Sequence, residues 1–255
     1  MRSRVAIILT SLIASMLAFA APVAAADFGN CANNYPNGIN FAGYDGPSGG
    51  QKHGVSATID GQVIHQCSNP GFIVTTGSFA WVGLDGGGGS DGNVIMQLGD
   101  GECRDPGING CDSGFHWYYA WGRDASATGC AGFSHRNSSP QTLSGYDGAA
   151  HDFKVYHQNN AWRFFIGSTQ VTSVSEASMC WTPTNATWFE ETWDPGDALG
   201  GSLADKLGTN LANYANAENG GFFWASFPST CKYNPAAPRH CVRVNSTSFN
   251  VWTDR

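Results

Sequence analysis

Charged residues are scarce in this chain, and basic residues are the scarcest. Lys and Arg together number 13 of 255 residues against 20 Asp and Glu, and the formal net charge is −7. Nucleic-acid binding depends on basic side chains that neutralise phosphates. The charge balance therefore argues against a nucleic-acid partner.

Long hydrophobic runs are also missing, apart from one at the N-terminus. Arg2 and Arg4 precede an apolar run over 5–20, and small residues follow at 24–26. This order is typical of a secretory signal peptide, and we expect cleavage after Ala26. The run is short for a membrane span, and no second one follows it. We therefore expect a secreted, extracellular protein without a membrane segment in its mature form.

Several signatures of hydrolases and metal sites are absent. The sequence has no HExxH or CxxC motif, and its seven histidines show no paired ligand spacing. GxSxG occurs only within Gly-rich breaks, at 46–50 and 88–92, without the strand-to-helix pattern of a nucleophile elbow. Serine-nucleophile chemistry has no support on these grounds, and zinc is a weak alternative. Acidic residues at 85–91 and 100–105 do not keep EF-hand spacing, so acidic turns explain them better than a calcium site. We expect no metal and no other cofactor.

Eight cysteines remain after the expected cleavage site. An even number in an exported chain is typical of a disulfide framework, and we expect four bridges. Cys103 with Cys111 and Cys231 with Cys241 are near enough in sequence to close local loops. The pairing of the other four cysteines stays open.

The pattern of short aromatic and β-branched segments between Gly-rich breaks favours an all-β fold. We expect one domain, an antiparallel two-sheet β-sandwich over 55–255, after a signal peptide over 1–26 and an irregular lead-in over 27–54. The expected strands are 55–59, 63–66, 72–75, 79–84, 94–98, 116–121, 152–157, 162–166, 187–193, 222–227 and 249–252.

One segment, 202–214, has its leucines at helical spacing. Leu203, Leu207 and Leu211 recur every four residues, and Ser202 is available as an N-cap. Gly208 disfavours a helix interior. A short helix or an extended surface loop is expected there.

Gln97 is a polar residue inside an otherwise apolar strand. In the strand over 93–98 it lies on the face opposite Met96 and Leu98, which form the better core face. It therefore points away from the core. The alternative is an ordinary exposed glutamine on the wet face of a half-buried strand.

Two adjacent carboxylates, Glu190 and Glu191, interrupt the aromatic strand over 187–193. Neighbouring residues of a strand point to opposite faces, so one of the two can face Gln97. A glutamine and a glutamate on one face can activate water and stabilise an oxyanion. A shift of register by one residue would exchange the two glutamates.

Four segments, in this order, resemble the eqolisin-type glutamic peptidases. They are AWVGLDG at 80–86, IMQLG at 95–99, YYAW at 118–121 and ATWFEETW at 186–193, and FWASF at 223–227 is similar to a Phe-rich segment of that family. The resemblance implies a concanavalin-like or jelly-roll β-sandwich. It also implies a secreted endopeptidase that cleaves polypeptide substrates at acidic pH, and we expect a monomer.

The resemblance matches Trp81, Gln97 and Glu191 to positions of the family's motifs and implies that Gln97 and Glu191 are the catalytic pair. We expect Trp81 and Tyr119 to flank the substrate. Because the strand runs directly into Asp-Pro-Gly after residue 193, Glu190 stays an alternative to Glu191. The segment TGCAGF at 128–133 is more weakly similar to neprosin-type glutamic peptidases, which use two glutamates.

The nine tryptophans also fit a non-catalytic sandwich that binds carbohydrate or another extracellular ligand. A second alternative is an exported structural or inhibitory protein that has lost the pair. A peptidase requires Gln97 and one of the glutamates on a shared face. A lectin-like protein would instead present a planar exposed row of Trp and Tyr.

Overall fold

The computed structural model describes residues 40–47, 49–61, 76–86, 95–104, 112–122, 137–179, 181–192, 200–232 and 239–254. The expected signal peptide, the two expected strands at 63–66 and 72–75, and the expected Cys103–Cys111 bridge lie outside the residues and side chains so described. Within those ranges, no helix is long and apolar enough to cross a membrane.

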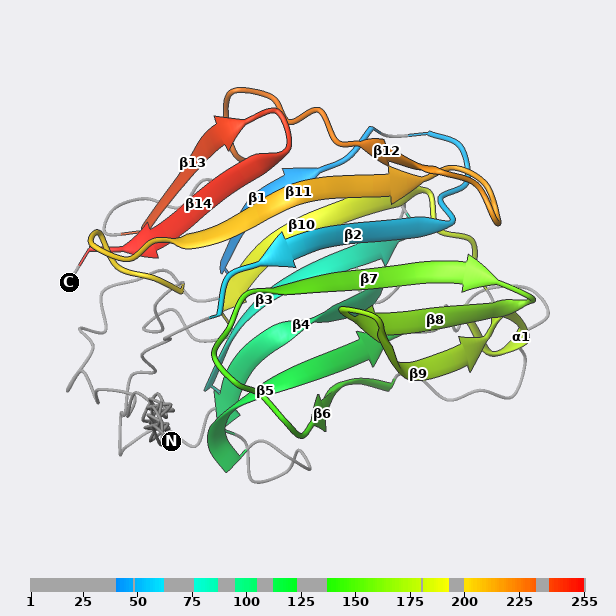
Figure 1. Cartoon of the computed structure of the whole chain (residues 1–255), viewed down its shortest axis with the longest axis horizontal. Coiled ribbons are helices and arrows are strands. Elements are labelled where there is room, and N and C mark those ends of the chain that lie inside the picture. The colour runs from blue at the N-terminus through cyan, green and yellow to red at the C-terminus, as the bar shows by residue number, and fades with distance from the viewer. Residues whose placement is uncertain are drawn as a thin grey trace, which may run out of the picture.

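Two antiparallel sheets face each other (Figure 1), and the prediction of an all-β two-sheet sandwich is confirmed. Among the described residues, sheet A has six strands in the order β1 (Asn40–Asp45), β10 (Asn185–Thr192), β3 (Thr76–Asp85), β4 (Ile95–Arg104), β5 (Asp112–Trp121) and β6 (Asn137–Leu143).

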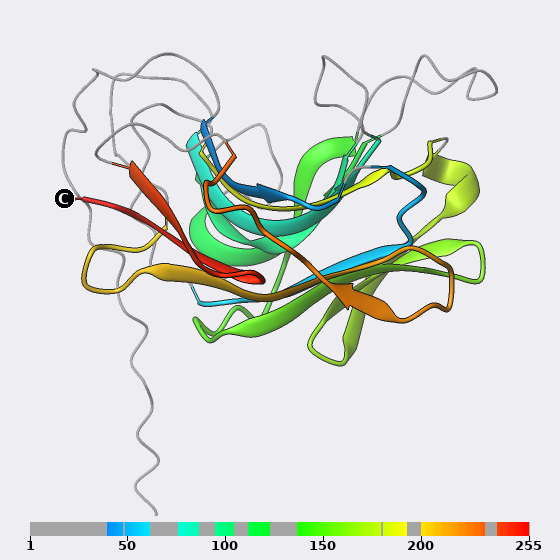
Figure 2. The ribbon, with the colours of Figure 1, turned by 90° about the horizontal axis from the view of Figure 1, so that it is seen from above.

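Sheet B contains eight of the described strands. Their order is β13 (Arg239–Asn245), β14 (Ser248–Thr253), β11 (Leu207–Ala215), β2 (Gly54–Ile59), β7 (His151–Gln158), β8 (Ala161–Ile166) and β9 (Thr169–Ser175), and β12 (Phe222–Trp224) pairs with β11. A four-residue helix, α1 (Glu176–Met179), follows β9. Sheet A is strongly bent, and its concave face is turned away from sheet B (Figure 2).

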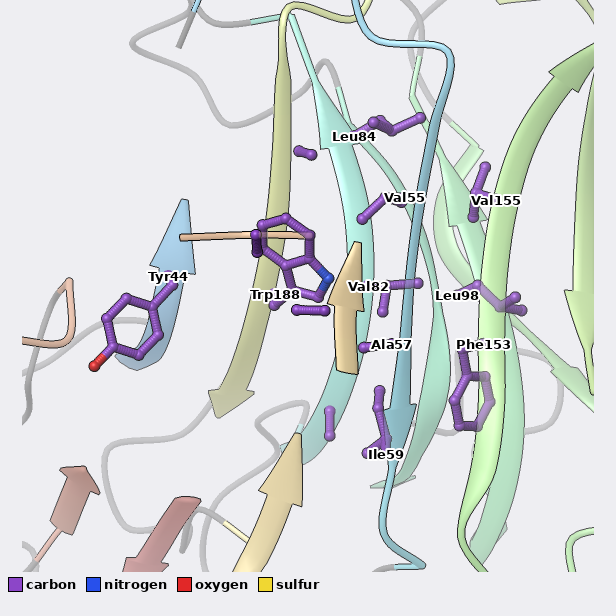
Figure 3. Packing of buried hydrophobic residues seen from close by; sticks show 14 of the residues in the cluster. Tyr44, Val55, Ala57, Ile59, Val82, Leu84, Leu98, Phe153, Val155 and Trp188 are labelled. Carbon is purple, nitrogen blue, oxygen red and sulfur yellow. The ribbon is translucent and has the colours of Figure 1, made fainter. Parts of the chain in front are cut away.

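The main core lies between the two sheets and is built by strict alternation. On β3, Val82 and Leu84 point inward and are fully buried, and on β2 Val55 and Ile59 meet them from the other sheet (Figure 3). Trp188 of β10 fills the centre, and its indole N–H donates to the Ser56 carbonyl of β2 at 3.0 Å. This bond satisfies a buried donor and connects the two sheets.

The Cys231–Cys241 disulfide is present, as expected from its short spacing. Both cysteines are buried in the main core beside β13 and β14. The bridge therefore connects the segment after β12 to β13.

The prediction of a short helix over 202–214 is wrong, because residues 207–215 form the strand β11. Leu207 points into the core, but the register with β2 shifts between Asn210 and Asn213, and Leu211 lies in the bulge with φ of 53°. The bulge leaves Leu211 exposed and returns Ala212 to the core. Leu207 and Leu211 thus have helical spacing without sharing a buried face.

The sandwich also begins earlier than expected. β1 lies inside the segment 27–54, and it pairs along its whole length with β10. Tyr44 of β1 is buried and stacks on Phe227 with ring centroids 4.4 Å apart. Residues 40–45 are therefore an edge strand of sheet A.

Candidate active site on the outer face of sheet A

A second, smaller apolar cluster lies on the concave face of sheet A, which we call the outer face. It consists of four aromatic side chains, none more than 5% exposed, with Phe41 and Ile95 packed against them: Phe79, Trp81, Tyr118 and Phe189. They come from β3, β5 and β10, at the positions that alternate with the main core. Gln97 and Glu191 occupy the same outer positions on β4 and β10.

Glycines on β3 and β4 make room for these rings. A Cβ at Gly83 would approach the Trp81 ring to 2.7 Å, and a Cβ at Gly101 would approach the Phe79 ring to 2.4 Å. The rings therefore lie down on the sheet instead of standing away from it. Phe79 reaches Tyr118 across β4 in this way, with ring centroids 4.8 Å apart.

Glu191 is held by Trp81. The Trp81 indole Nε1 donates to Glu191 Oε2 at 3.1 Å, and the two residues are 2% and 8% exposed. A hydrogen bond to a carboxylate is stronger than one between neutral groups and favours the ionised form. Trp81 thus both orients Glu191 and stabilises its negative charge.

Gln97 lies on the outer face with Glu191, but the two are not direct cross-strand neighbours. Glu191 pairs with Phe79 and Gln97 pairs with Gly83, so they are two strands and four residues apart. Standard strand geometry puts their Cα atoms about 16 Å apart on a flat sheet, and the bend of sheet A shortens the gap between their side-chain tips. The Trp81 ring, which extends over Gly83, lies between them.

Thr187 is the residue directly across Gly83 from Gln97. It pairs with Gly83 from the β10 side, is 2% exposed, and its hydroxyl is buried without a hydrogen-bond partner in the described part of the chain. The row Thr187, Gly83 and Gln97 therefore carries a hydroxyl and an amide but no carboxylate. Only pairing of the strands, not the sequence pattern of either one, identifies Thr187.

Tyr118 adds a buried hydroxyl to this face. Its side chain is 2% exposed, and its hydroxyl has no hydrogen-bond partner among the described residues. Burial, followed by the negative charges of Glu191 and Asp100, raises the pKa of Tyr118 well above its usual value. Tyr118 therefore stays neutral in the acidic and neutral pH range.

Glu190 lies on the opposite face of β10, inside the sandwich. It is 1% exposed, and its Oε2 accepts a hydrogen bond from the Gly200 backbone N–H at 3.0 Å. Burial raises the pKa of Glu190 well above its usual value, and the charge of Asp100 raises it further, against the Gly200 hydrogen bond. Of the two adjacent glutamates, Glu191 is the one on the face of Gln97.

Tyr119 also points into the sandwich. Its ring packs against Phe164 of sheet B at 5.7 Å, so it is on the face opposite Gln97 and Trp81. This placement gives no support to its predicted contact with a substrate at Gln97. Its neighbour Tyr118 is the β5 tyrosine on the outer face. Alternation along 116–121 puts Tyr118 and Tyr119 on opposite faces, so the sequence signals that only one of them can share the face of Gln97.

No protein-family model matches the chain, and no curated protein matches it. Solved structures with a similar fold include a scytalido-glutamic peptidase bound to a transition-state analogue inhibitor. The two chains are 16% identical with a TM-score of 0.49, and the match covers 84% of this chain and 98% of that one. Another is SCP-B, a member of the eqolisin family of peptidases bound to the tripeptide Ala-Ile-His, with 15% identity, a TM-score of 0.47 and the same coverages.

A glycoside hydrolase family 16 endo-glucanase from Bacteroides ovatus is also similar, with 12% identity and a TM-score of 0.36, covering 61% of this chain and 66% of that one. The eqolisin-type peptidases that the sequence motifs resemble are thus among the solved structures of similar outline. At these similarities the assignment of a function depends on the residues of this chain.

Proposed function

We propose that this chain is a secreted glutamic-type endopeptidase that hydrolyses peptide bonds at acidic pH, with Gln97 and Glu191 as its catalytic pair. The observation that carries the proposal is the Glu191 carboxylate, which Trp81 orients on the same outer face as Gln97. The sequence motifs around Trp81, Gln97 and Glu191 support the same assignment. Secretion rests on the N-terminal sequence pattern alone.

Glu191 is the general base in this mechanism. Its carboxylate takes a proton from a water molecule, and the water oxygen attacks the carbonyl carbon of the scissile peptide bond. The Gln97 side-chain amide donates a hydrogen bond to the oxyanion that forms. Glu191 then gives the proton to the departing amine, so the carboxylate returns to its starting state.

The separation of the pair restricts how a substrate can bind. A water on Glu191 and a carbonyl oxygen on Gln97 must together bridge the gap above the Trp81 ring, with both side chains extended toward each other. An extended polypeptide running across β3 would place its carbonyl there, whereas a single water bound to both residues would be too small. The pair is therefore completed only when substrate is bound.

The acidic pH optimum follows from the dual role of one carboxylate. Glu191 must be ionised to accept a proton and must be acidic enough to release it to the amine. An ordinary glutamate titrates near pH 4.3. Activity should therefore lie in the acidic range.

A non-catalytic ligand-binding protein is the second candidate. The observation that favours it is the row Thr187, Gly83 and Gln97, in which no carboxylate lies directly opposite Gln97. In this alternative the outer face of sheet A binds an extracellular ligand without cleaving it. The two candidates differ in whether Glu191 is needed for turnover.

The test is incubation of the secreted chain with a reduced and alkylated protein substrate at several acidic and neutral pH values, with mass spectrometry of the products. Gln97→Ala and Glu191→Gln should each lower the cleavage rate by about a hundredfold or more. Glu190→Gln is the matched control, because it alters the adjacent carboxylate on the other face and should keep its activity. Cleavage that survives Glu191→Gln would refute the pair, and absence of cleavage by the unaltered protein would favour the ligand-binding alternative.

A further inference from the structure

The face of sheet B turned away from sheet A carries a row of side chains that includes aromatic and basic residues. Residues that alternate with the core positions line up across neighbouring strands in the order Trp224, Asn213, Ser56, Lys154, Phe165 and Gln170. We call this row and the aromatic residues beside it the sheet B platform. It crosses β12, β11, β2, β7, β8 and β9, which face the viewer in Figure 1.

Aromatic rings lie on this platform, and one of them is largely exposed. Trp224 is 61% exposed, although it belongs to a hydrogen-bonded strand. Beside it, Phe222 lies down over Gly54, where a Cβ would meet its Cζ at 2.9 Å, and its ring centroid is 6.1 Å from that of Tyr156. Trp224 therefore adds an exposed ring to a partly buried aromatic pair, Phe222 and Tyr156, on one face of the sheet.

The charges of the platform are all positive. Lys154 carries its ammonium 4.8 Å above the Phe165 ring, and Arg163, one row away, donates to Gln170 at 3.2 Å. The row from Trp224 to Gln170 and the neighbouring row through Tyr156 and Arg163 contain no acidic residue. Asp152 lies in the row on the other side of Lys154, where its carboxylate accepts a hydrogen bond from the Thr58 hydroxyl. The two named rows thus carry only positive charge in a chain whose formal net charge is −7.

We propose that the sheet B platform binds an anionic polysaccharide, a polymer of the uronic acid type. Its aromatic rings would stack on the C–H faces of the sugar rings, and Asn213, Ser56 and Gln170 would bond their hydroxyl groups. Lys154 and Arg163 would pair with the sugar carboxylates. From Trp224 to Phe165 the platform spans four strand spacings, about 19 Å, which suits a polymer rather than a single sugar.

The platform is distinct from the proposed catalytic site. Gln97 and Glu191 lie on the outer face of sheet A, with the main core between them and the platform. Binding of polysaccharide is therefore independent of whether Glu191 supports catalysis. A secreted protein with such a platform would be retained on an acidic polymer outside the cell.

The test is affinity electrophoresis of the full secreted chain through gels containing polygalacturonate, with dextran as the neutral polymer. Trp224→Ala should weaken association by about tenfold, the effect of losing one aromatic stacking contact. Phe223→Ala is the matched control, because Phe223 is the adjacent residue of β12, is 54% exposed and packs instead toward Tyr214. That control should retain the binding of the unaltered chain.

Charge is tested separately with Lys154→Gln, compared with Lys206→Gln, which removes a positive charge from above Trp252 at the other end of the sheet. Lys154→Gln should reduce both the retention of the chain by polygalacturonate and the salt dependence of that retention, whereas Lys206→Gln should change neither. The proposal is overturned if polygalacturonate does not retard the unaltered chain at low salt, or if dextran retards it equally. It is also overturned if Trp224→Ala and Phe223→Ala behave alike, or if a single-stranded oligonucleotide competes more strongly than polygalacturonate.

Discussion

The indole N–H of Trp81 donates a hydrogen bond to the carboxylate of Glu191, with the nitrogen and oxygen 3.1 Å apart on the outer face of sheet A. Both residues are almost fully buried, so the bond is protected from competing water. The same indole extends over Gly83, next to Gln97. Trp81 therefore controls both the charge of Glu191 and the space between the two proposed catalytic residues.

Trp81→Phe keeps an aromatic ring on the outer face but removes the donor to Glu191. Without that hydrogen bond the ionised form of Glu191 is less stable, so a higher pH is needed to generate the base. The acidic limb of the pH profile of kcat/KM should move toward neutral pH, and the maximum rate should fall. Peptide hydrolysis measured across the acidic range checks this.

Tyr118→Phe is the control for that experiment. It changes another aromatic residue of the same cluster, and the hydroxyl that it removes has no hydrogen-bond partner in the described structure. The bond between Trp81 and Glu191 stays intact, so the acidic limb should stay in place. An equal movement of the limb in both variants would show that the aromatic cluster as a whole, and not the indole donor, sets the profile.

Glu190 should make the fold more stable in acid than at neutral pH. Its folded-state pKa is raised above the unfolded value by burial and then by Asp100. A group shifted in this direction contributes its full stability below the unfolded pKa and loses it as the pH rises through the folded pKa. The free energy of unfolding should therefore decrease from about pH 4 upward.

Glu190→Gln removes this titration while keeping an oxygen for the Gly200 N–H. At pH 3 its free energy of unfolding should match that of the unaltered protein. At pH 8 it should exceed it by about 1–3 kcal/mol, the cost of a poorly compensated buried polar group. Urea unfolding at both pH values measures this, with Asp205→Asn at the surface as the control; equal stability at pH 8 would contradict the account.

Gly99 should be essential to the bent sheet A. A Cβ at Gly99 would lie 1.9 Å from the Ala80 carbonyl oxygen, which belongs to the backbone of β3 and cannot move aside. Gly99→Ala should cost about 3 kcal/mol of unfolding free energy. Gly221→Ala, where a Cβ meets nothing within 4 Å, should change it by less than about 1 kcal/mol. Thermal unfolding of the two variants compares them directly.

The sequence predicts the faces of the site residues well, because alternation along a strand is a local property. The assignment of Gln97 to the face opposite Met96 and Leu98 required only the apolar pattern of one strand, and the structure places both of these in the main core. The separation of Gln97 and Glu191 along the sheet cannot be predicted from alternation. It depends on the registers of β3 with β4 and of β3 with β10, and the second register joins segments about a hundred residues apart.

Two further differences have local physical causes. Leu207 and Leu211 have helical spacing, but Leu207 points inward whereas the bulge leaves Leu211 exposed and returns Ala212 to the core. Tyr118 and Tyr119 are chemically alike, so composition does not tell which one joins Trp81. The packing of Tyr119 against Phe164 of sheet B shows that Tyr119 points into the sandwich and leaves Tyr118 on the outer face with Trp81.

The central claim is that Gln97 and Glu191 act together on one peptide bond, and a double-mutant cycle tests it most directly. The second-order rate constant kcat/KM for a peptide substrate is measured at the acidic optimum for the unaltered chain, Gln97→Ala, Glu191→Gln and the double variant. Residues that act as a unit give non-additive losses, so the double variant should be no slower than the slower single variant. Losses that multiply, or single variants as active as the unaltered chain, would contradict the claim.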